Sequence, residues 1–265
     1  MARLINAKVE EVALMVNTTY GINLAARALG LRAGDVVVAP AREFPANVYP
    51  WMALEKDGVT FEMIPALGDL VDEAALLRAL DRPNVRVLAV SWVSFATGYR
   101  VDLATLGRAC RERGIYFVVD AIQGLGPLTL DVRDVPIDIL ACGAQKWLLS
   151  PWGTGFVYVR DELVRALEPH DVGWMAMKAS EDFTKLLDYD FTYFDDARRF
   201  EVVTLPFQDI AGFVASLELL HELGPRDIES HVTRLVTMAV EWALSRSDVC
   251  LVTPREHAKR GGIVS

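Results

Sequence analysis

The 265-residue sequence is poor in cysteine, with only Cys110, Cys142 and Cys250 spread along the chain. Such a small and widely spaced set excludes a disulfide framework and a cysteine-based zinc site, and we expect no metal. Unpaired cysteines are typical of a reducing compartment, so we expect a cytoplasmic protein. The N-terminus also lacks an apolar run of the signal-peptide type, and no later stretch reaches transmembrane length, so we expect no membrane partner.

Basic charge is scarce as well. The chain has 27 Lys and Arg against 36 Asp and Glu, which gives a formal net charge of −9, and it has no Lys/Arg-rich run. A protein that binds nucleic acid through the phosphate backbone needs a basic face, so this composition argues against one. Neither the G-x-G-x-x-G nor the G-x-x-x-x-G-K-[ST] pattern occurs, which disfavours a nucleotide-binding α/β protein.

The sequence does contain many short apolar runs, in a chain that is 52% hydrophobic and long enough to bury a large core. Runs of this kind, rich in Val and Ile, are typical of strands that are buried on both faces of a mostly parallel sheet. Amphipathic segments lie between them, which predicts an α/β fold. The predicted strands cover residues 12–16, 35–40, 59–65, 85–93, 115–121, 138–142 and 155–159.

The pattern changes after about residue 165. A loop rich in aromatic residues is followed by two predicted helices, roughly at 206–223 and 226–245. The run VCLVTP at 249–254 is predicted to be a strand. We therefore expect a large domain over 1–245, and the beginning of a second, incomplete small domain over 246–265.

Ligands of such sheets bind beyond the carboxyl ends of the strands, where this sequence places Asp120 and Lys146. Asp120 closes the run IYFVVD, and its alternative role is to cap the following turn. Lys146 lies between DILACGAQ and WLLSPWGTG, where apolar neighbours favour a nucleophilic amine. Its alternative is a lysine that extends from a strand end into solvent.

The combination of these two residues is more informative than either alone. Pyridoxal phosphate needs a lysine to bind its carbonyl carbon and an acid to keep its ring nitrogen protonated. Asp120 and Lys146, 26 residues apart, supply both groups. The sequence therefore indicates a pyridoxal-phosphate site.

Several segments resemble one family, the class V, cysteine desulfurase-like aminotransferases of fold type I. The most specific are the Asp-x-x-Gln motif in VVDAIQGLGPLTLDV and the lysine segment ACGAQKWLLSPWGTGFVYVR. The resemblance also includes NTTYGINLAARALGLRAGD, EFPANVYPW, SWVSFATGYRVDL and ARRFEVVTLPF, and it extends through nearly the whole chain. It implies a fold type I large domain with a mostly parallel seven-stranded sheet, only the start of the small domain, and a chain truncated at both ends.

The resemblance also implies roles for individual residues. Lys146 would form the Schiff base with pyridoxal 5'-phosphate, and Asp120 would hold the pyridinium nitrogen. Thr18 and Thr19 match the positions that bind the cofactor phosphate. They also open a predicted helix, whose free amides and dipole favour an anion. Helix capping by either threonine is the alternative and is compatible with phosphate binding.

Three further positions match the cofactor site. Phe44 replaces a histidine of many members and would stack against the pyridine ring; its alternative is a core residue before Pro45. Gln123 matches the residue that reaches the phenolic oxygen of the ring, and a turn-stabilising role is its alternative. Gln145, where relatives often carry His or Tyr, would bond the phosphate through its amide.

Thr204 matches a threonine that reaches the phosphate of the neighbouring subunit, which implies a homodimer. The expected function is that of a transferase or lyase acting on a small-molecule amino acid: a desulfurase or other lyase, an epimerase or an aminotransferase. Cys110, Cys142 and Cys250 do not match the catalytic cysteine of desulfurases. Cys110 lies in a predicted helix, and we expect Cys142 and Cys250, which lie in apolar strand patterns, to be buried. The alternative function is that of a truncated, non-catalytic homologue that binds the cofactor or dimerises.

Overall fold

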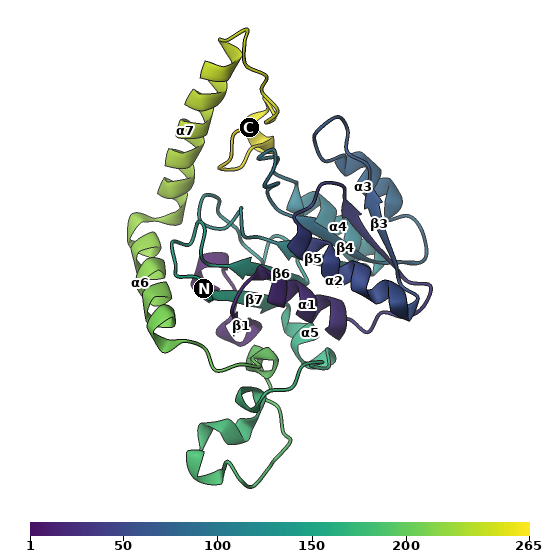
Figure 1. The fold of residues 1–265 in the computed structure, drawn as a ribbon, viewed down its shortest axis with the longest axis vertical. Helices are drawn as coiled ribbons and strands as arrows, with labels where there is room; N and C mark the ends of the chain where they lie inside the picture. Colours follow the sequence, from purple (N-terminus) through teal and green to yellow (C-terminus); the bar gives the residue numbers. More distant parts are fainter.

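The computed structural model describes all residues from Met1 to Ser265, and its centre is a seven-stranded sheet (Figure 1). The strand order is β1-β7-β6-β5-β4-β2-β3. All neighbouring pairs from β3 to β6 are parallel, and only β7 runs against the other strands. The strands are β1 (Val12–Met15), β2 (Val36–Pro40), β3 (Thr60–Ile64), β4 (Val85–Ser91), β5 (Tyr116–Asp120), β6 (Ile139–Gly143) and β7 (Gly155–Val159). The predicted mostly parallel α/β sheet is confirmed.

The central strands are buried on both faces. Every residue of β2, β6 and β7 is buried. Successive side chains of a strand point to opposite faces. Accordingly, Val36 and Val38 belong to one hydrophobic cluster and Val37 belongs to the other. This two-sided burial explains why the strands appear in the sequence as continuous apolar runs instead of alternating ones.

Seven α-helices accompany the sheet. The side chains of Asp72 and Asp102 cap α3 and α4 by accepting hydrogen bonds from backbone amides, and Gly114 ends α4 at a positive φ of 64°. The short helices α2 and α5 were not predicted from the sequence. The helices are α1 (Thr18–Ala28), α2 (Tyr49–Met52), α3 (Glu73–Ala79), α4 (Leu103–Arg113), α5 (Asp161–Ala166), α6 (Phe207–Leu223) and α7 (Pro225–Leu244). Short 3-10 helices lie at Ala2–Ile5, Val9–Glu11, Pro45–Asn47, Ala53–Asp57, Trp174–Ala176, Lys178–Glu181, Phe183–Lys185, Ala197–Phe200 and His257–Lys259.

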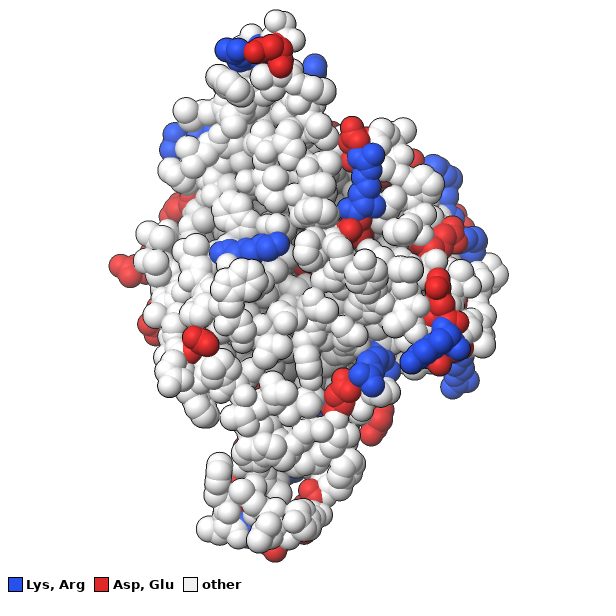
Figure 2. Space-filling model, in the orientation of Figure 1, with Lys and Arg blue, Asp and Glu red and all other residues white.

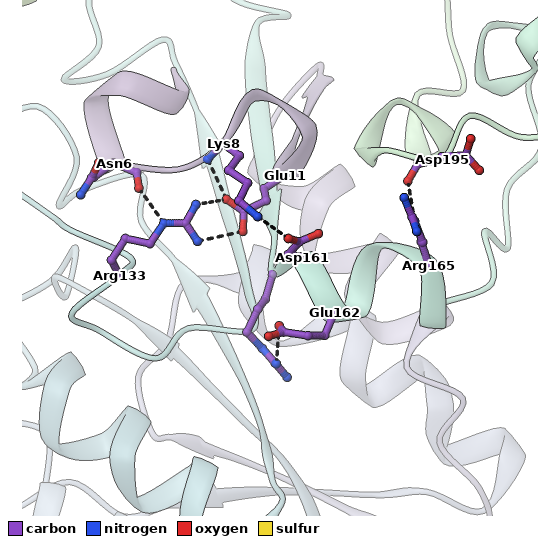
Figure 3. A network of polar contacts seen from close by, with 9 residues as sticks. Asn6, Lys8, Glu11, Arg133, Asp161, Glu162, Arg165 and Asp195 are labelled. Atoms are coloured by element: carbon purple, nitrogen blue, oxygen red, sulfur yellow. Dashed lines mark hydrogen bonds and ion pairs between the residues drawn. The ribbon is translucent and has the colours of Figure 1, made fainter.

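An ion pair between a buried carboxylate and a partly exposed arginine fastens the N-terminal segment to the rest of the molecule (Figure 3). Glu11 is fully buried and is bound by both terminal nitrogens of Arg133. The backbone N–H of Lys8 donates to the same carboxylate over 2.7 Å, and the Lys8 ammonium pairs with Asp161 at the start of α5. The segment before β1 is thereby tied to the loop before β6 and to α5.

The chain after α5 leaves the sheet. Residues 168–200 form a lobe that extends to the bottom of Figure 1 and returns to β1 through the 3-10 helix Ala197–Phe200, and α6 and α7 then run along one side of the molecule. The strand predicted over 249–254 is wrong: this segment is irregular, and the N–H groups of Val252 and Thr253 instead donate to the carbonyl of Ser265. Without that strand Cys250 is exposed, contrary to expectation, whereas Cys110 and Cys142 are buried.

The surface carries both signs of charge. On the face drawn in Figure 2, acidic and basic side chains are interspersed along the right-hand edge, and the middle of the face carries few charges. No helix is both long enough and apolar enough to span a lipid bilayer.

Candidate functional site

A cavity of about 310 Å³ lies where the carboxyl ends of β1, β5 and β6 meet the N-terminus of α1. Its size is within the range of small-molecule sites. Six of the eight site residues expected from the sequence line it, although they come from distant parts of the chain. The lining residues are Val16, Asn17, Thr18, Thr19, Phe44, Ala46, Asp120, Ile122, Gln145, Lys146, Trp152 and Gly153.

Asp120 is the last residue of β5 and is 2% exposed. Burial raises the pKa of its carboxyl group to about 6, although the N–H of Ile122 and the charge of Lys146 both act to lower it. The Ile122 N–H donates to Asp120 Oδ1 over 3.0 Å, so the aspartate also caps the turn, as the alternative interpretation expected. Its carboxylate therefore has a fixed orientation, and a cation placed next to it would stabilise its charged form.

Lys146 follows β6 by three residues and enters the cavity beside an aromatic ring. Its Nζ lies 5.5 Å from the ring centroid of Phe44. The Phe44 ring packs edge-on against Phe95, with centroids 5.3 Å apart. Phe44 is 42% exposed, so it is not the core residue of the alternative interpretation. The amine and the flat ring are available to the same ligand.

The N-terminus of α1 forms another wall of the cavity. Asn17 caps the helix, since its Oδ1 accepts from the N–H of Tyr20 over 2.9 Å. The threonines do not have the capping role that was their alternative. Thr18 is buried and its Oγ1 accepts from the N–H of Gly143 over 2.8 Å, while Thr19 is exposed.

Gln145 packs on Gly143 beside this helix end and lines the cavity. Gln145 Oε1 is buried and has no hydrogen-bond partner. A Cβ atom on Gly143 would lie 2.6 Å from that oxygen and 3.3 Å from the backbone nitrogen of Thr18. The lack of a side chain at Gly143 therefore allows the Gln145 amide to lie close to the backbone of the α1 N-terminus.

Two expected site residues do not line the cavity. Gln123 lies beside it, and its Oε1 accepts a hydrogen bond from the indole Nε1 of Trp147 over 3.1 Å. Thr204 is exposed in the connection between the last 3-10 helix of the lobe and α6.

Sequence reasoning missed Glu43, which lies beside Asp120. Its Oε1 accepts from the backbone N–H of Ser91 over 2.6 Å, and its Oε2 binds the Ser91 hydroxyl. Burial raises the pKa of Glu43 to about 7; the hydrogen bonds from Ser91 oppose this rise, and the charge of Asp120 adds to it. Ser91 pairs with Asp120 in the sheet register. The only sequence signal was the position of Glu43 just after a predicted strand.

Comparison with known proteins places the chain in a family. The profile described as "Aminotransferase class-V" matches residues 1–265. A probable cysteine desulfurase of Methanothermobacter thermautotrophicus is 33% identical over 87% of this chain and 56% of its own length. A probable cysteine desulfurase of Pyrococcus abyssi is 32% identical over 100% of this chain and 65% of its own length.

Solved structures agree with these sequence matches. The apo cysteine desulfurase of Thermococcus onnurineus superimposes with a TM-score of 0.87 and 28% identity, over 99% of this chain and 64% of that one. The chain thus spans less than two thirds of the length of each of these three relatives. It belongs to the aminotransferase class-V family of pyridoxal-phosphate-dependent enzymes.

Proposed function

We propose that this chain binds pyridoxal 5'-phosphate in the cavity between α1 and the carboxyl ends of β5 and β6, and that it acts there on an amino acid. The observation that carries the proposal is the convergence of Lys146, Asp120 and the α1 N-terminus on one cavity of about 310 Å³. Lys146 would hold the cofactor covalently through Nζ. When bound, the cofactor supplies an electron sink for the bonds around the substrate's α-carbon.

The polar space beside α1 fits the phosphate group. Free amides at a helix N-terminus attract an anion through their partial positive charge. The unpartnered Gln145 amide lies at this space, and rotating it by 180° would turn its NH₂ group toward an anion. Thr19 adds an exposed hydroxyl. Gly143 lets the Gln145 amide lie this close to the helix end, since any side chain there would collide with it.

Asp120 fits the protonated ring nitrogen. Its carboxylate is buried and is destabilised as an anion, which is why its pKa is raised to about 6. A cation placed against it would relieve that cost. The hydrogen bond from Ile122 holds the carboxylate in place, so Asp120 would keep a proton on the ring nitrogen at neutral pH.

Phe44 and Lys146 have the two remaining proposed roles, which are orientation of the cofactor ring and proton transfer. The exposed face of Phe44 would orient the ring by stacking and exclude water from one side of it. With a substrate bound, the amine of Lys146 would be the base that moves a proton at the substrate's α-carbon. It is the only basic residue among those that line the cavity.

Four reaction subtypes are candidates. The chain would act as a desulfurase, as another lyase, as an epimerase or as an aminotransferase. Two of the relatives described above are named probable cysteine desulfurases, which makes cysteine the first substrate to test. The buried, unpaired Cys110 and Cys142 are compatible with a cytoplasmic location. The alternative function, a cofactor-binding or dimerising protein without turnover, is a defined outcome of the same test.

The test is a titration of the purified chain with pyridoxal phosphate, followed by visible absorbance, and then by a panel of amino acids with product analysis. We expect a yellow band that saturates and that cysteine or another amino acid perturbs. Gln145→Leu should weaken cofactor affinity by about 10- to 100-fold, because a charge-assisted hydrogen bond is lost. A folded chain without a band would refute the proposal, and a band that no amino acid perturbs would favour the non-catalytic alternative.

We further propose that the protein is a homodimer, in which Thr204 reaches the phosphate of the neighbouring site. Thr204 is exposed and does not line its own cavity. Large apolar side chains in the same region are 68–84% exposed, which is typical of an interface. These side chains are Phe183, Leu187, Tyr189 and Phe191.

We also propose that residues 1–245 form a large domain and that residues 246–265 are the start of a small domain.

Mixed dimers test the role of Thr204. A Lys146→Ala chain carries an intact Thr204, and a Thr204→Ala chain carries an intact Lys146. When the two are mixed, the proposal predicts one complete site per heterodimer. Tight cofactor binding should therefore be restored at one of the two sites of each heterodimer. A monomer in sizing experiments, or mixtures that bind no better than Thr204→Ala alone, would contradict it.

A further inference from the structure

One side-chain hydrogen bond joins the two segments that carry the proposed catalytic groups. Trp147 Nε1 donates to Gln123 Oε1 over 3.1 Å. Trp147 directly follows Lys146, and Gln123 lies three residues after Asp120. The bond therefore crosses from the lysine-bearing loop after β6 to the aspartate-bearing loop after β5.

The chemistry of the indole determines the orientation of the amide. An indole N–H can only donate, so Gln123 must turn its carbonyl oxygen toward Trp147. The amide NH₂ of Gln123 is then directed away from the indole, with its hydrogens available to another acceptor. Without the indole N–H, the two orientations of this amide would differ far less in free energy.

Trp147 is itself enclosed between two glycines. At Gly126, which has a positive φ of 108°, an added Cβ would lie 2.8 Å from the Cβ of Trp147. At Gly262, an added Cβ would lie 2.8 Å from the Cζ2 atom of the indole ring. Both contacts are closer than a side chain allows, so the backbone packs directly on Trp147 from the aspartate loop and from the C-terminal segment.

The C-terminal segment is held in place independently of Trp147. The N–H of Gly261 donates to the carbonyl of Gly98, and the N–H of Arg100 donates to the carbonyl of Lys259, both over 2.9 Å. Residues 259–262 therefore lie along 98–100, and this fixes where Gly262 meets the indole.

We propose that Trp147 is a positioning residue of the cofactor site. Its indole fixes the Gln123 amide with the NH₂ group available to the ring oxygen of the cofactor, and the backbone at Gly262 fixes the indole. This inference rests on the proposed function. A donor to a negatively charged oxygen stabilises its charged form and lowers the associated pKa. Loss of the fixed donor should therefore raise the pH at which the bound chromophore changes colour.

The experiment is a pH titration of the visible absorption band in the cofactor-loaded chain. For Trp147→Phe, we expect the midpoint to rise by about half to one pH unit and cofactor affinity to fall by about 3- to 10-fold. Trp147→His keeps a ring N–H and should lie nearer the wild type. Trp242→Phe, which changes an exposed tryptophan on α7, should leave the midpoint unchanged.

A purely structural role gives a different result. It would lower the unfolding temperature of the cofactor-free Trp147→Phe variant while the pH midpoint stays at the wild-type value, and that outcome would overturn the inference. A wild-type chain without any band would overturn the proposed function, and this inference with it. A wild-type band with an unchanged midpoint in Trp147→Phe overturns this inference alone.

Gly262→Ala provides a second, independent variant. The added methyl must displace the indole, so the midpoint should shift in the same direction as in Trp147→Phe. Because both changes act through one contact, the double variant should shift no further than Trp147→Phe. If Trp147→Phe does not fold, Gly262→Ala decides: an unchanged midpoint would overturn the inference.

Discussion

Asp120 links the chemistry of the site to the stability of the fold. Its side chain is buried at the edge of the sheet, and its pKa is raised from 3.8 to about 6, mainly by burial. A raised carboxyl pKa means that the folded, cofactor-free chain binds its proton more tightly than the unfolded chain does. The free energy of unfolding therefore falls as the pH rises from about 4 to about 6, and the penalty remains at higher pH.

Asp120→Asn should make the cofactor-free chain more stable at pH 7.5, by on the order of 2 kcal/mol, because the buried charge is removed. The asparagine Oδ1 keeps the hydrogen bond from Ile122. At pH 4 the variant and the wild type should have nearly equal stability. Denaturant unfolding at the two pH values measures this difference, and a variant that is less stable at pH 7.5 would contradict the burial argument. The same variant should bind the cofactor more weakly.

Residues also show how far the sequence could predict the site. Thr18, Thr19, Phe44, Asp120, Gln145 and Lys146 were predicted from sequence and motif, and the fold brings them to one cavity. The partner of Gln123 could not be predicted, because it depends on how two loops pack. Glu43 was missed because a single carboxylate after a strand resembles an ordinary loop residue.

At the scale of elements, the packing of α1 on β6 sets the position of the α1 N-terminus. A Cβ on Gly21 would lie 2.6 Å from the Cβ of Ala141, so the helix and the strand approach at their backbones. Gly21→Ala should push the helix away, destabilise the protein by about 1–3 kcal/mol and weaken cofactor binding. Asn23→Ala, on the same helix, should do neither. Equal unfolding free energies for Gly21→Ala and the wild type would show that the contact is not tight.

The N-terminal segment depends on the ion pair between the buried Glu11 and the partly exposed Arg133. Arg133→Ala leaves the fully buried Glu11 carboxylate without its cation, and we expect a loss of roughly 2–3 kcal/mol in unfolding free energy. Arg133 is partly exposed and the Lys8 N–H remains, so we expect no greater loss. Lys8→Ala breaks only the exposed pair with Asp161 and should cost much less. Similar losses in the two variants would argue against a special role for burial.

The elements also show what periodicity can and cannot predict. The seven strands were found because each is a short apolar run in the sequence, and β2, β6 and β7 are buried along their whole length. The helices α2 and α5 have four and six residues, too few to produce a periodic pattern. The apolar run at 249–254 looked like a strand. A strand also needs a neighbouring strand to pair with, and the only backbone–backbone hydrogen bonds of this segment go to Ser265.

At the scale of the whole molecule, the site is assembled from separate elements. The sheet, the N-terminus of α1 and the loops after β5 and β6 each contribute one part of it. Parallel strands carry Asp120 and the Lys146 segment to the same edge, and α1 places its N-terminus, the proposed phosphate site, at that edge. The exposed aromatic side chains of the lobe over 168–200 are the basis for proposing that the lobe contacts a second copy of the chain. These features follow from the fold, whereas the choice of amino-acid substrate depends on groups around the cavity.

The most direct test of the central claim is borohydride reduction of the chain incubated with pyridoxal phosphate, followed by peptide mapping by mass spectrometry. The account predicts one cofactor trapped per chain, on the peptide that contains Lys146. The label should be absent in Lys146→Ala and unchanged in Lys178→Ala, which alters a lysine of the lobe that is paired with Asp195. Label distributed over other lysines, or no label on a well-folded chain, would contradict the account.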